Sequence, residues 1–489
     1  MSNYESKVGS GRRKLIWAAT AICALLTRNA HAEDHWIRLK TPHFEMYTTG
    51  SEKQGMAALN VFEQVRYFFT ENNKLNADQS APVRIIAFRS EKEFRPYRLN
   101  EGGFAYYVQS RKVDYIVMQD ISPEHYPAVM HEYTHLILQH SGLKLPVWLN
   151  EGLADLYSSL EPRGNQAMVG RAAPGRVELL TSQRWMDLSV MLESGKDSAY
   201  YNERDKMSIF YAQSWALTHM LAMSEEYGPQ FPKFVTEVAS GRPTAESIQL
   251  IYGKTLSQVT TELHAYVSRS SLGAAVYNVN LAKQDLEPYL SEPSGFAMDL
   301  VLTDLLAAQK RTQAEAAERL MRLAAEHPES AEVQESLGYL AWSEDDKSKA
   351  LECFRLATEK GSKNSEMLIH YAQLLYQSAA PADKIAQVLQ KVVEIKPDNQ
   401  EAWFNLGNMA TRARDYGAAL TALSHVKTVT TERAYALFST RAFCLMQLRS
   451  LKLARESAEQ AQKYARTPEE QSQGLALLRH LDSLERGGR

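Results

Sequence analysis

The spacing of apolar and polar residues divides the chain into a mixed first part and a helical second part. Three stretches have the composition of strands: "HFEMYTT" at residues 43–49, "PVRIIAF" at 82–88 and "KVDYIVMQD" at 112–120. Residues 52–69 carry apolar side chains at helical spacing. Helical patterns dominate after Ser122. Strands gathered early and helices gathered late predict an α+β fold for residues 33–267.

The pattern is interrupted between residues 268 and 296, where serine, glycine and proline residues break any long period. We expect a linker in this segment, followed by a second domain at residues 297–489. A truncated chain that ends near Tyr266 is therefore expected to fold and act without the second domain.

The second domain contains an internal repeat. In an alignment of residues 335–361 with 404–426, Leu337 and Gly338 match Leu406 and Gly407, Ala350 matches Ala419, and Phe354 faces Leu423. Together with Pro397 and Trp403, these positions resemble the tetratricopeptide repeat, a helix hairpin of about 34 residues. Weaker copies begin near Ala297, Ser365 and Tyr435. The resemblance implies an all-α solenoid, which is either a plain scaffold or a concave surface that binds a protein partner.

The composition is that of a globular protein that begins with an export signal. Of the 489 residues, 44% are hydrophobic, and the net charge of -3 gives no electrostatic reason to expect nucleic acid or an anionic membrane as a partner. Residues 1–32 combine a basic start, "GRRK", with a short apolar run and a cleavage site, "AHA". We expect a signal peptide, a periplasmic or secreted mature chain, and no stable membrane span after cleavage. An uncleaved anchor is the alternative.

The segment "HEYTH" carries the candidate chemistry. His131 and His135 lie inside one predicted helix, between a start signal at Ser122 and a stop signal at Gly142. A separation of four residues places both imidazoles on one face, where they can converge on one ion. Glu132 is rotated by about 100° from His131, which places it beside the ion and within reach of a water molecule. This is the spacing of two metal ligands and a general base.

A second helix is predicted to begin at Pro146 and carries Glu151 and Asp155 one turn apart. A catalytic zinc ion takes three protein ligands and keeps one position open, and a carboxylate is a suitable third ligand. Glu151 fills that position. Asp155 can accept the outer N–H of a ligating histidine and so fix its orientation.

The HExxH segment followed by a helix with "NEGLAD" resembles the gluzincin metallopeptidases. The flanking stretches "WIRLKTPHFEMYTT" and "FYAQSWALTHML" are similar to peptidase-MA-like domains fused to tetratricopeptide repeats in exported bacterial proteins. The resemblance implies a zincin-like domain with Zn²⁺ bound by His131, His135 and Glu151. No "GxMEN" stretch of the aminopeptidase branch is present, which argues against N-terminal trimming.

The hydrogen-bond donor for the developing oxyanion is expected on the helix "MSIFYAQSWALTHML", where Tyr211 and His219 are the candidates. The same stripe of residues also fits plain core packing. The resemblance favours Tyr211, because several gluzincin branches use a tyrosine downstream of the third ligand.

Other polar residues near the site are expected to be solvated. His125 and His140 lie off the one-turn spacing of the ligand pair, and Arg163, Arg171 and Arg176 fit a surface hairpin, with a substrate-binding role the less favoured alternative. The sequence as a whole predicts an exported zinc endopeptidase whose repeats recruit a protein partner or substrate. The alternative is a non-catalytic envelope scaffold in which the zinc domain is structural.

Overall fold

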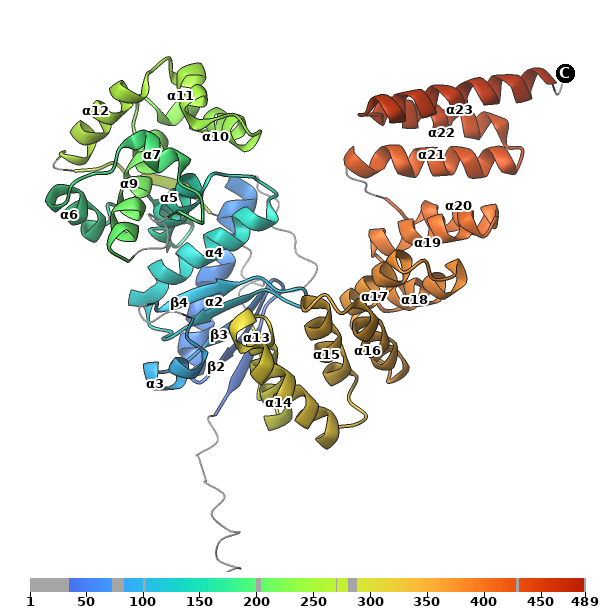
Figure 1. Ribbon diagram of the computed structural model, residues 1–489, viewed down its shortest axis with the longest axis horizontal. Coiled ribbons are helices and arrows are strands. Elements are labelled where there is room, and N and C mark those ends of the chain that lie inside the picture. Colours follow the sequence, from blue (N-terminus) through green and yellow to red (C-terminus); the bar gives the residue numbers. More distant parts are fainter. Residues whose placement is uncertain are drawn as a thin grey trace, which may run out of the picture.

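The computed structural model describes residues 35–72, 83–99, 103–198, 204–269, 271–279, 288–427 and 431–487. The expected signal peptide, residues 1–32, lies outside the described residues. A sheet-containing part and a series of helix hairpins that runs to the C-terminus lie side by side (Figure 1). Within the described ranges, none of the helices combines the length and the apolar character needed to cross a bilayer.

A six-stranded mixed sheet forms the first part. Its strands, in spatial order, are β4 (Ala105–Val108), β5 (Tyr115–Met118), β3 (Val83–Ala87), β2 (Phe44–Thr48), β1 (Ile37–Lys40) and β9 (Tyr289–Ser291). The three central strands β2, β3 and β5 run parallel, and the outer strands pair antiparallel. These three are the strands that the sequence predicts, because strands buried on both faces read as continuous apolar runs.

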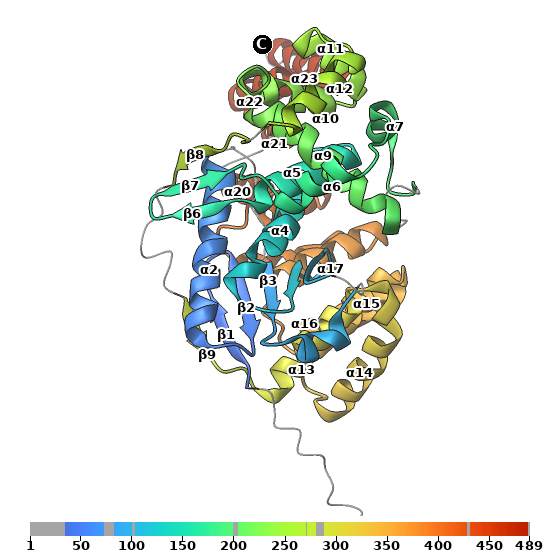
Figure 2. The same ribbon diagram turned by 90° about the vertical axis from the view of Figure 1, so that its left-hand side faces the viewer.

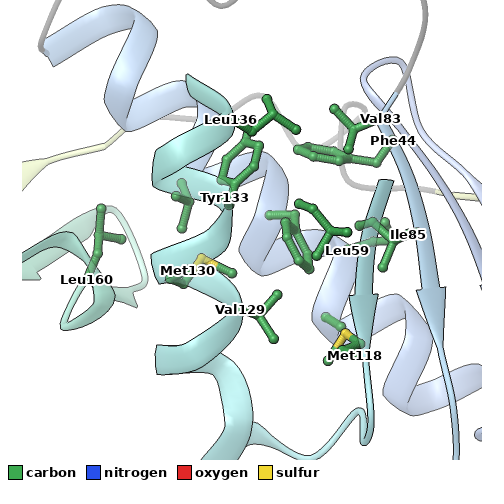
Figure 3. Close-up of a cluster of buried hydrophobic side chains, with 14 of the residues drawn as sticks. Phe44, Leu59, Val83, Ile85, Met118, Val129, Met130, Tyr133, Leu136 and Leu160 are labelled. Atoms are coloured by element: carbon green, nitrogen blue, oxygen red, sulfur yellow. The ribbon is translucent and has the colours of Figure 1, made fainter. Parts of the chain in front are cut away.

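Two helices cover one face of the sheet (Figure 2): α2 (Glu52–Tyr67) and α4 (Tyr126–His140). Ser51 begins α2 with a capping box, in which its hydroxyl accepts from the backbone N–H of Gln54. Figure 3 shows Phe44, Ile85 and Met118 of the sheet against Leu59 of α2 and Val129 and Tyr133 of α4. This core fixes the position of α4, the helix that carries the HExxH residues.

The opposite face is covered by helix α13 (Gly295–Ala307), whose Met298, Val301 and Leu305 share a core with Ile86 and Val117 of the sheet. The expected linker, residues 268–296, also contributes strands. Strand β9 extends the large sheet, and β8 (Ala275–Asn278) joins β6 (Glu161–Arg163) and β7 (Gln166–Val169) in a second sheet. The first part is therefore built from segments that precede and segments that follow the HExxH helix in the sequence.

Helices complete the first part, which also contains α5 (Val147–Ser158). They are α3 (Glu91–Phe94), α6 (Pro174–Ser182), α7 (Leu188–Glu193), α9 (Arg204–Met223), α10 (Phe231–Ala239), α11 (Thr244–Tyr252) and α12 (Leu256–Val267). Gly152 of α5 lies against α9, and a Cβ atom there would be 2.1 Å from Oγ1 of Thr218 and 2.5 Å from the carbonyl oxygen of Ser214. Glycine is required for this close approach, which brings α9 alongside the second site helix.

The second part is a stack of antiparallel helix hairpins, which confirms the predicted helical repeat. After α13 come α14 (Gln313–Glu326), α15 (Ala331–Ser343), α16 (Lys347–Glu359), α17 (Ser365–Gln377), α18 (Ala382–Ile395), α19 (Gln400–Arg412), α20 (Tyr416–Ser424), α21 (Thr431–Gln447), α22 (Leu451–Tyr464) and α23 (Pro468–Gly487). Gly338 packs on Phe354, and Gly407 packs on Leu423 in the same way. A Cβ atom at either glycine would lie only 2.5 Å from the nearest carbon of that side chain, so a larger residue does not fit. The aligned glycines therefore have the same task in both hairpins.

A second periodicity lies in the backbone. Asp345, Ala379, Arg414 and Arg449 adopt left-handed conformations with φ of 64°, 55°, 61° and 62°. Each lies in the turn between the two helices of one hairpin, and successive members are 34, 35 and 35 residues apart. The four turns thus share one geometry, although their residue types differ.

Candidate metal centre

Helices α4 and α5 bring His131, His135 and Glu151 together. The Nε2 atoms of the two histidines are 3.1 Å apart, and each lies 3.4 Å from Oε2 of Glu151. Ligands arranged tetrahedrally around zinc at about 2.0 to 2.2 Å are about 3.3 to 3.6 Å from one another. The three donor atoms therefore form a triangle of the size that fits a zinc ion. Among the described residues, His131, His135 and Glu151 are the group of His, Cys, Asp or Glu side chains that lie close enough together to hold a metal ion.

Hydrogen bonds on the outer side orient both imidazoles. Nδ1 of His131 lies 2.9 Å from Oδ1 of Asp155, and Nδ1 of His135 lies 2.6 Å from Oδ1 of Asn150. Because carboxylate and amide oxygens accept, both Nδ1 atoms donate, and both Nε2 atoms face the centre of the triangle, where they are the atoms that would bind a metal ion. The structure brings Asp155 to the position expected from the sequence. Asn150 has the equivalent position on His135 and was not singled out by the sequence.

The electrostatics of the triangle favour a cation. Burial acts to lower the pKa of His131, but the carboxylates of Asp155 and Glu151 outweigh burial and raise that pKa to about 10. Burial also acts to raise the pKa of Glu151, but hydrogen bonds from His131 and His135 outweigh it and hold the pKa well below its usual range. A site that stabilises imidazolium this strongly contains negative charge that a metal ion can also use.

Glu132 lies beside the triangle and contacts the edge of the sheet. Its Oε2 accepts a hydrogen bond of 3.0 Å from the backbone N–H of Tyr107 in β4. Burial raises the pKa of Glu132, although the neighbouring histidines act in the opposite direction. A carboxyl group with a raised pKa is suited to accept and return a proton near neutral pH.

A cleft of about 490 Å³ opens in front of these residues. Its lining includes Phe104 and Ala105 of the β4 edge, His131 and Glu132, Asp155, Arg176 and Tyr211. The edge strand β4 has one neighbouring strand, so one side of its backbone faces the cleft. A volume of this size is in the range of ligand-binding clefts.

Tyr211 is the one of the two donor candidates that reaches the cleft. Its ring centre lies 6.4 Å from that of His131. His219 is fully buried, with Nε2 2.8 Å from the carbonyl oxygen of Gly170 and Nδ1 2.7 Å from the hydroxyl of Tyr266. Because burial lowers the pKa of His219, the neutral ring donates to Gly170 and accepts from Tyr266. His219 therefore has a structural role.

Arg176 and His140, which the sequence predicts to be solvated, have buried carboxylate partners in the structure. Arg176 forms an ion pair with Asp155, with Nη2 2.8 Å from Oδ2, and its guanidinium carbon lies 5.4 Å from the ring centre of Tyr211. Nε2 of His140 lies 2.5 Å from Oδ2 of Asp114. Arg163 and Arg171 pair with Glu161 on the exposed hairpin, as the sequence predicts. Arg176 thus joins the site from α6, where no spacing rule links it to α4.

Comparisons with known proteins are limited to the repeat fold. No protein-family model and no curated protein matches the sequence. Similar solved structures include YrrB, a TPR protein with an unusual peptide-binding site, which is 16% identical over 38% of this chain and 90% of that chain, with a TM-score of 0.30. Pseudomonas aeruginosa pilF is 17% identical over 40% of this chain and 87% of that chain (TM-score 0.29). MamA from Desulfovibrio magneticus RS-1 is 14% identical over 32% of this chain and 96% of that chain, with a TM-score of 0.25. The helical repeat of this chain is shown by its own hairpins and glycine contacts.

Proposed function

We propose that the chain is a zinc-dependent endopeptidase of the gluzincin type. The observation that carries this proposal is the triangle of His131, His135 and Glu151 with Glu132 beside it at the cleft. Three ligands from two adjacent helices leave one coordination position for chemistry, which is the arrangement of catalytic zinc sites.

Each residue of the site has a part in the proposed reaction. When bound, zinc supplies a Lewis acid that polarises a carbonyl group and lowers the pKa of water to about 7. Glu132 accepts a proton from the attacking water and returns it to the leaving amine. Tyr211 donates a hydrogen bond to the oxyanion, and Asp155 and Asn150 hold the imidazoles in place. The substrate lies as an extended peptide against β4, whose outer backbone edge pairs with it.

The proposal also covers the role of the helical hairpins and the cellular location of the protein. A stack of hairpins offers an extended surface, and we assign it to the binding of a protein partner or substrate. The basic and apolar character of residues 1–32 supports a periplasmic or secreted protein.

The second candidate is a non-catalytic scaffold in which the hairpins bind partners and the metal is structural. The extent of the repeat, from α13 to α23, favours this candidate. The number of ligands favours the enzyme, because structural zinc sites are closed by four protein ligands, whereas the cluster in the described residues has three.

The deciding experiment compares the wild-type chain with Glu132→Gln in metal analysis and in digestion of casein and a peptide library. Glu124→Gln, an exposed glutamate just before α4, is the matched control. We expect all three proteins to hold one zinc ion and only Glu132→Gln to lose hydrolysis. Wild-type chain that binds zinc and cleaves nothing would support the scaffold, and full activity in Glu132→Gln would exclude the proposed mechanism.

A further inference from the structure

We propose that the first helical repeats position the edge strand β4, and through it the carboxylate of Glu132, with Lys112 as the positioning residue. This inference rests on the proposed function for its catalytic consequence. Its structural content, that α13 and α15 hold β4 in place, is independent of that function.

The tip of the β4–β5 hairpin, residues 109–114, is attached to the repeats. Nζ of Lys112 lies 2.6 Å from Oδ2 of Asp304 in α13 and 2.7 Å from Oγ of Ser336 in α15. The side chains of Lys112 and Asp304 are only 15% and 5% exposed. The guanidinium carbon of Arg111 lies 4.4 Å from the ring centre of Trp342 in α15. A largely buried ion pair and a cation–π contact therefore join this tip to two helices of the second part.

The residues next to this tip, and the tip itself, also contact the site helix α4. Tyr107 of β4 donates its backbone N–H to Glu132, and its hydroxyl lies 3.2 Å from Oδ2 of Asp114. Asp114 also accepts from the backbone N–H of Ser110 at 3.1 Å and contacts His140, the last residue of α4. The hairpin tip is thus bound to the repeats on one side and to the end of the metal-binding helix on the other.

Strand β4 needs this attachment because it lies at the edge of the sheet. It has β5 as its neighbour on one side, while the other side faces the cleft. Loss of the Lys112 ammonium would leave the buried Asp304 carboxylate without this ion pair and would weaken the attachment of the hairpin tip to α13 and α15. A displacement of the base by about 1 Å is enough to reduce a rate by about 100-fold.

The test uses the full chain with Lys112→Met and the charge-conserving Lys112→Arg. Lys254→Met is the matched control, because Lys254 is similarly shielded (19% exposed) and pairs with Glu226 and Glu262 away from the hairpin. The readouts are bound zinc, kcat and KM on an unstructured peptide, and amide hydrogen exchange of residues 104–108. For Lys112→Met we expect zinc to be retained, exchange in β4 to accelerate and kcat to fall by about 10- to 100-fold. Lys112→Arg is expected to keep exchange in β4 slow and to retain most of the wild-type kcat.

The outcomes separate the two proposals. Unchanged β4 exchange in Lys112→Met, or an equal loss of rate in Lys254→Met, would overturn the positioning role. A wild-type chain without any hydrolysis would remove the proposed function. In that case, faster β4 exchange in Lys112→Met would still support the attachment of β4 to the repeats, and unchanged exchange would overturn it.

Discussion

Asn150 is the residue whose role is most easily isolated, because its side-chain hydrogen bond is to one metal ligand, His135. Its amide oxygen lies 2.6 Å from Nδ1 of His135. Asn150→Leu keeps a similar volume and removes the acceptor, so His135 loses its fixed tautomer. We expect zinc affinity to fall by about 10- to 100-fold in chelator competition. Asn405→Leu, a half-buried asparagine in α19, is the control and is expected to leave zinc affinity unchanged.

Tyr211 allows a test of chemistry without loss of metal. Tyr211→Phe removes only the hydroxyl, and the ring still packs beside His131 and Arg176. If the hydroxyl acts mainly on the oxyanion, kcat should fall by about 10²- to 10³-fold while KM and zinc content stay near wild-type values. Steady-state kinetics on a peptide substrate would measure this. Normal turnover in Tyr211→Phe would assign the tyrosine to packing.

The residues that the sequence predicted are those whose relationship is local. His131, Glu132 and His135 share one helix, and Glu151 and Asp155 share the next, so helical spacing is enough to group them. Asn150 shares that helix too, but its contact with His135 depends on how the two helices cross. Arg176 and the backbone N–H of Tyr107 come from other elements, and a backbone donor leaves no trace in residue type. No periodicity could have identified these three groups.

At the level of elements, the left-handed turn of each hairpin offers a way to stabilise the repeats. Ala379 has a φ of 55° and is exposed, so it bears conformational strain without contributing to the core. Ala379→Gly should therefore raise the free energy of unfolding by about 0.5 to 1 kcal/mol in urea titrations. Ala413→Gly is the control, because Ala413 is also exposed but has a φ of -75°. This substitution is expected to lower the free energy of unfolding.

The elements that escaped sequence analysis are short or lack an alternating pattern. The central strands were predicted because most of their residues are apolar or β-branched, but β9 has three residues, and its Tyr289 and Leu290 are 69% and 41% exposed. Pairing with β1 defines this strand, and pairing between distant segments has no local signature. The same reason explains why residues 268–296 read as a linker, although they extend both sheets.

For the molecule as a whole, the expectation of an independent first domain needs revision. A chain ending near Tyr266 lacks β9 and α13 and exposes the outer face of the sheet, including Ile86, Phe88 and Val117. Uncovering about six large apolar side chains costs on the order of 10 kcal/mol, which is comparable to the whole stability of a domain. We therefore expect this truncated chain to be insoluble or degraded.

A longer truncation tests the reason for that failure. A chain ending after α16 keeps α13 and α15, with the partners of Arg111 and Lys112, and removes only the later hairpins. It is expected to remain soluble and to bind zinc. Soluble yield and zinc content would be compared for the two truncated chains and the full chain. A soluble, zinc-binding chain that ends near Tyr266 would contradict the assignment of α13 to the core of the first part.

The pairing of β9 with β1 has a consequence for the order in which the molecule forms. Arg38 of β1 pairs with Ser291, and Lys112 bonds to Ser336, which lies 224 positions further along the chain. During synthesis, these contacts cannot form until the later residue has been made. At synthesis rates of about 5 to 20 residues per second, the partners of β1 and Lys112 emerge about 10 to 50 seconds after them. During this interval the sheet has an unpaired edge and an uncovered apolar face, which are the features that make chaperones necessary. The proposed peptidase would thus complete its active centre only after most of the chain has been made.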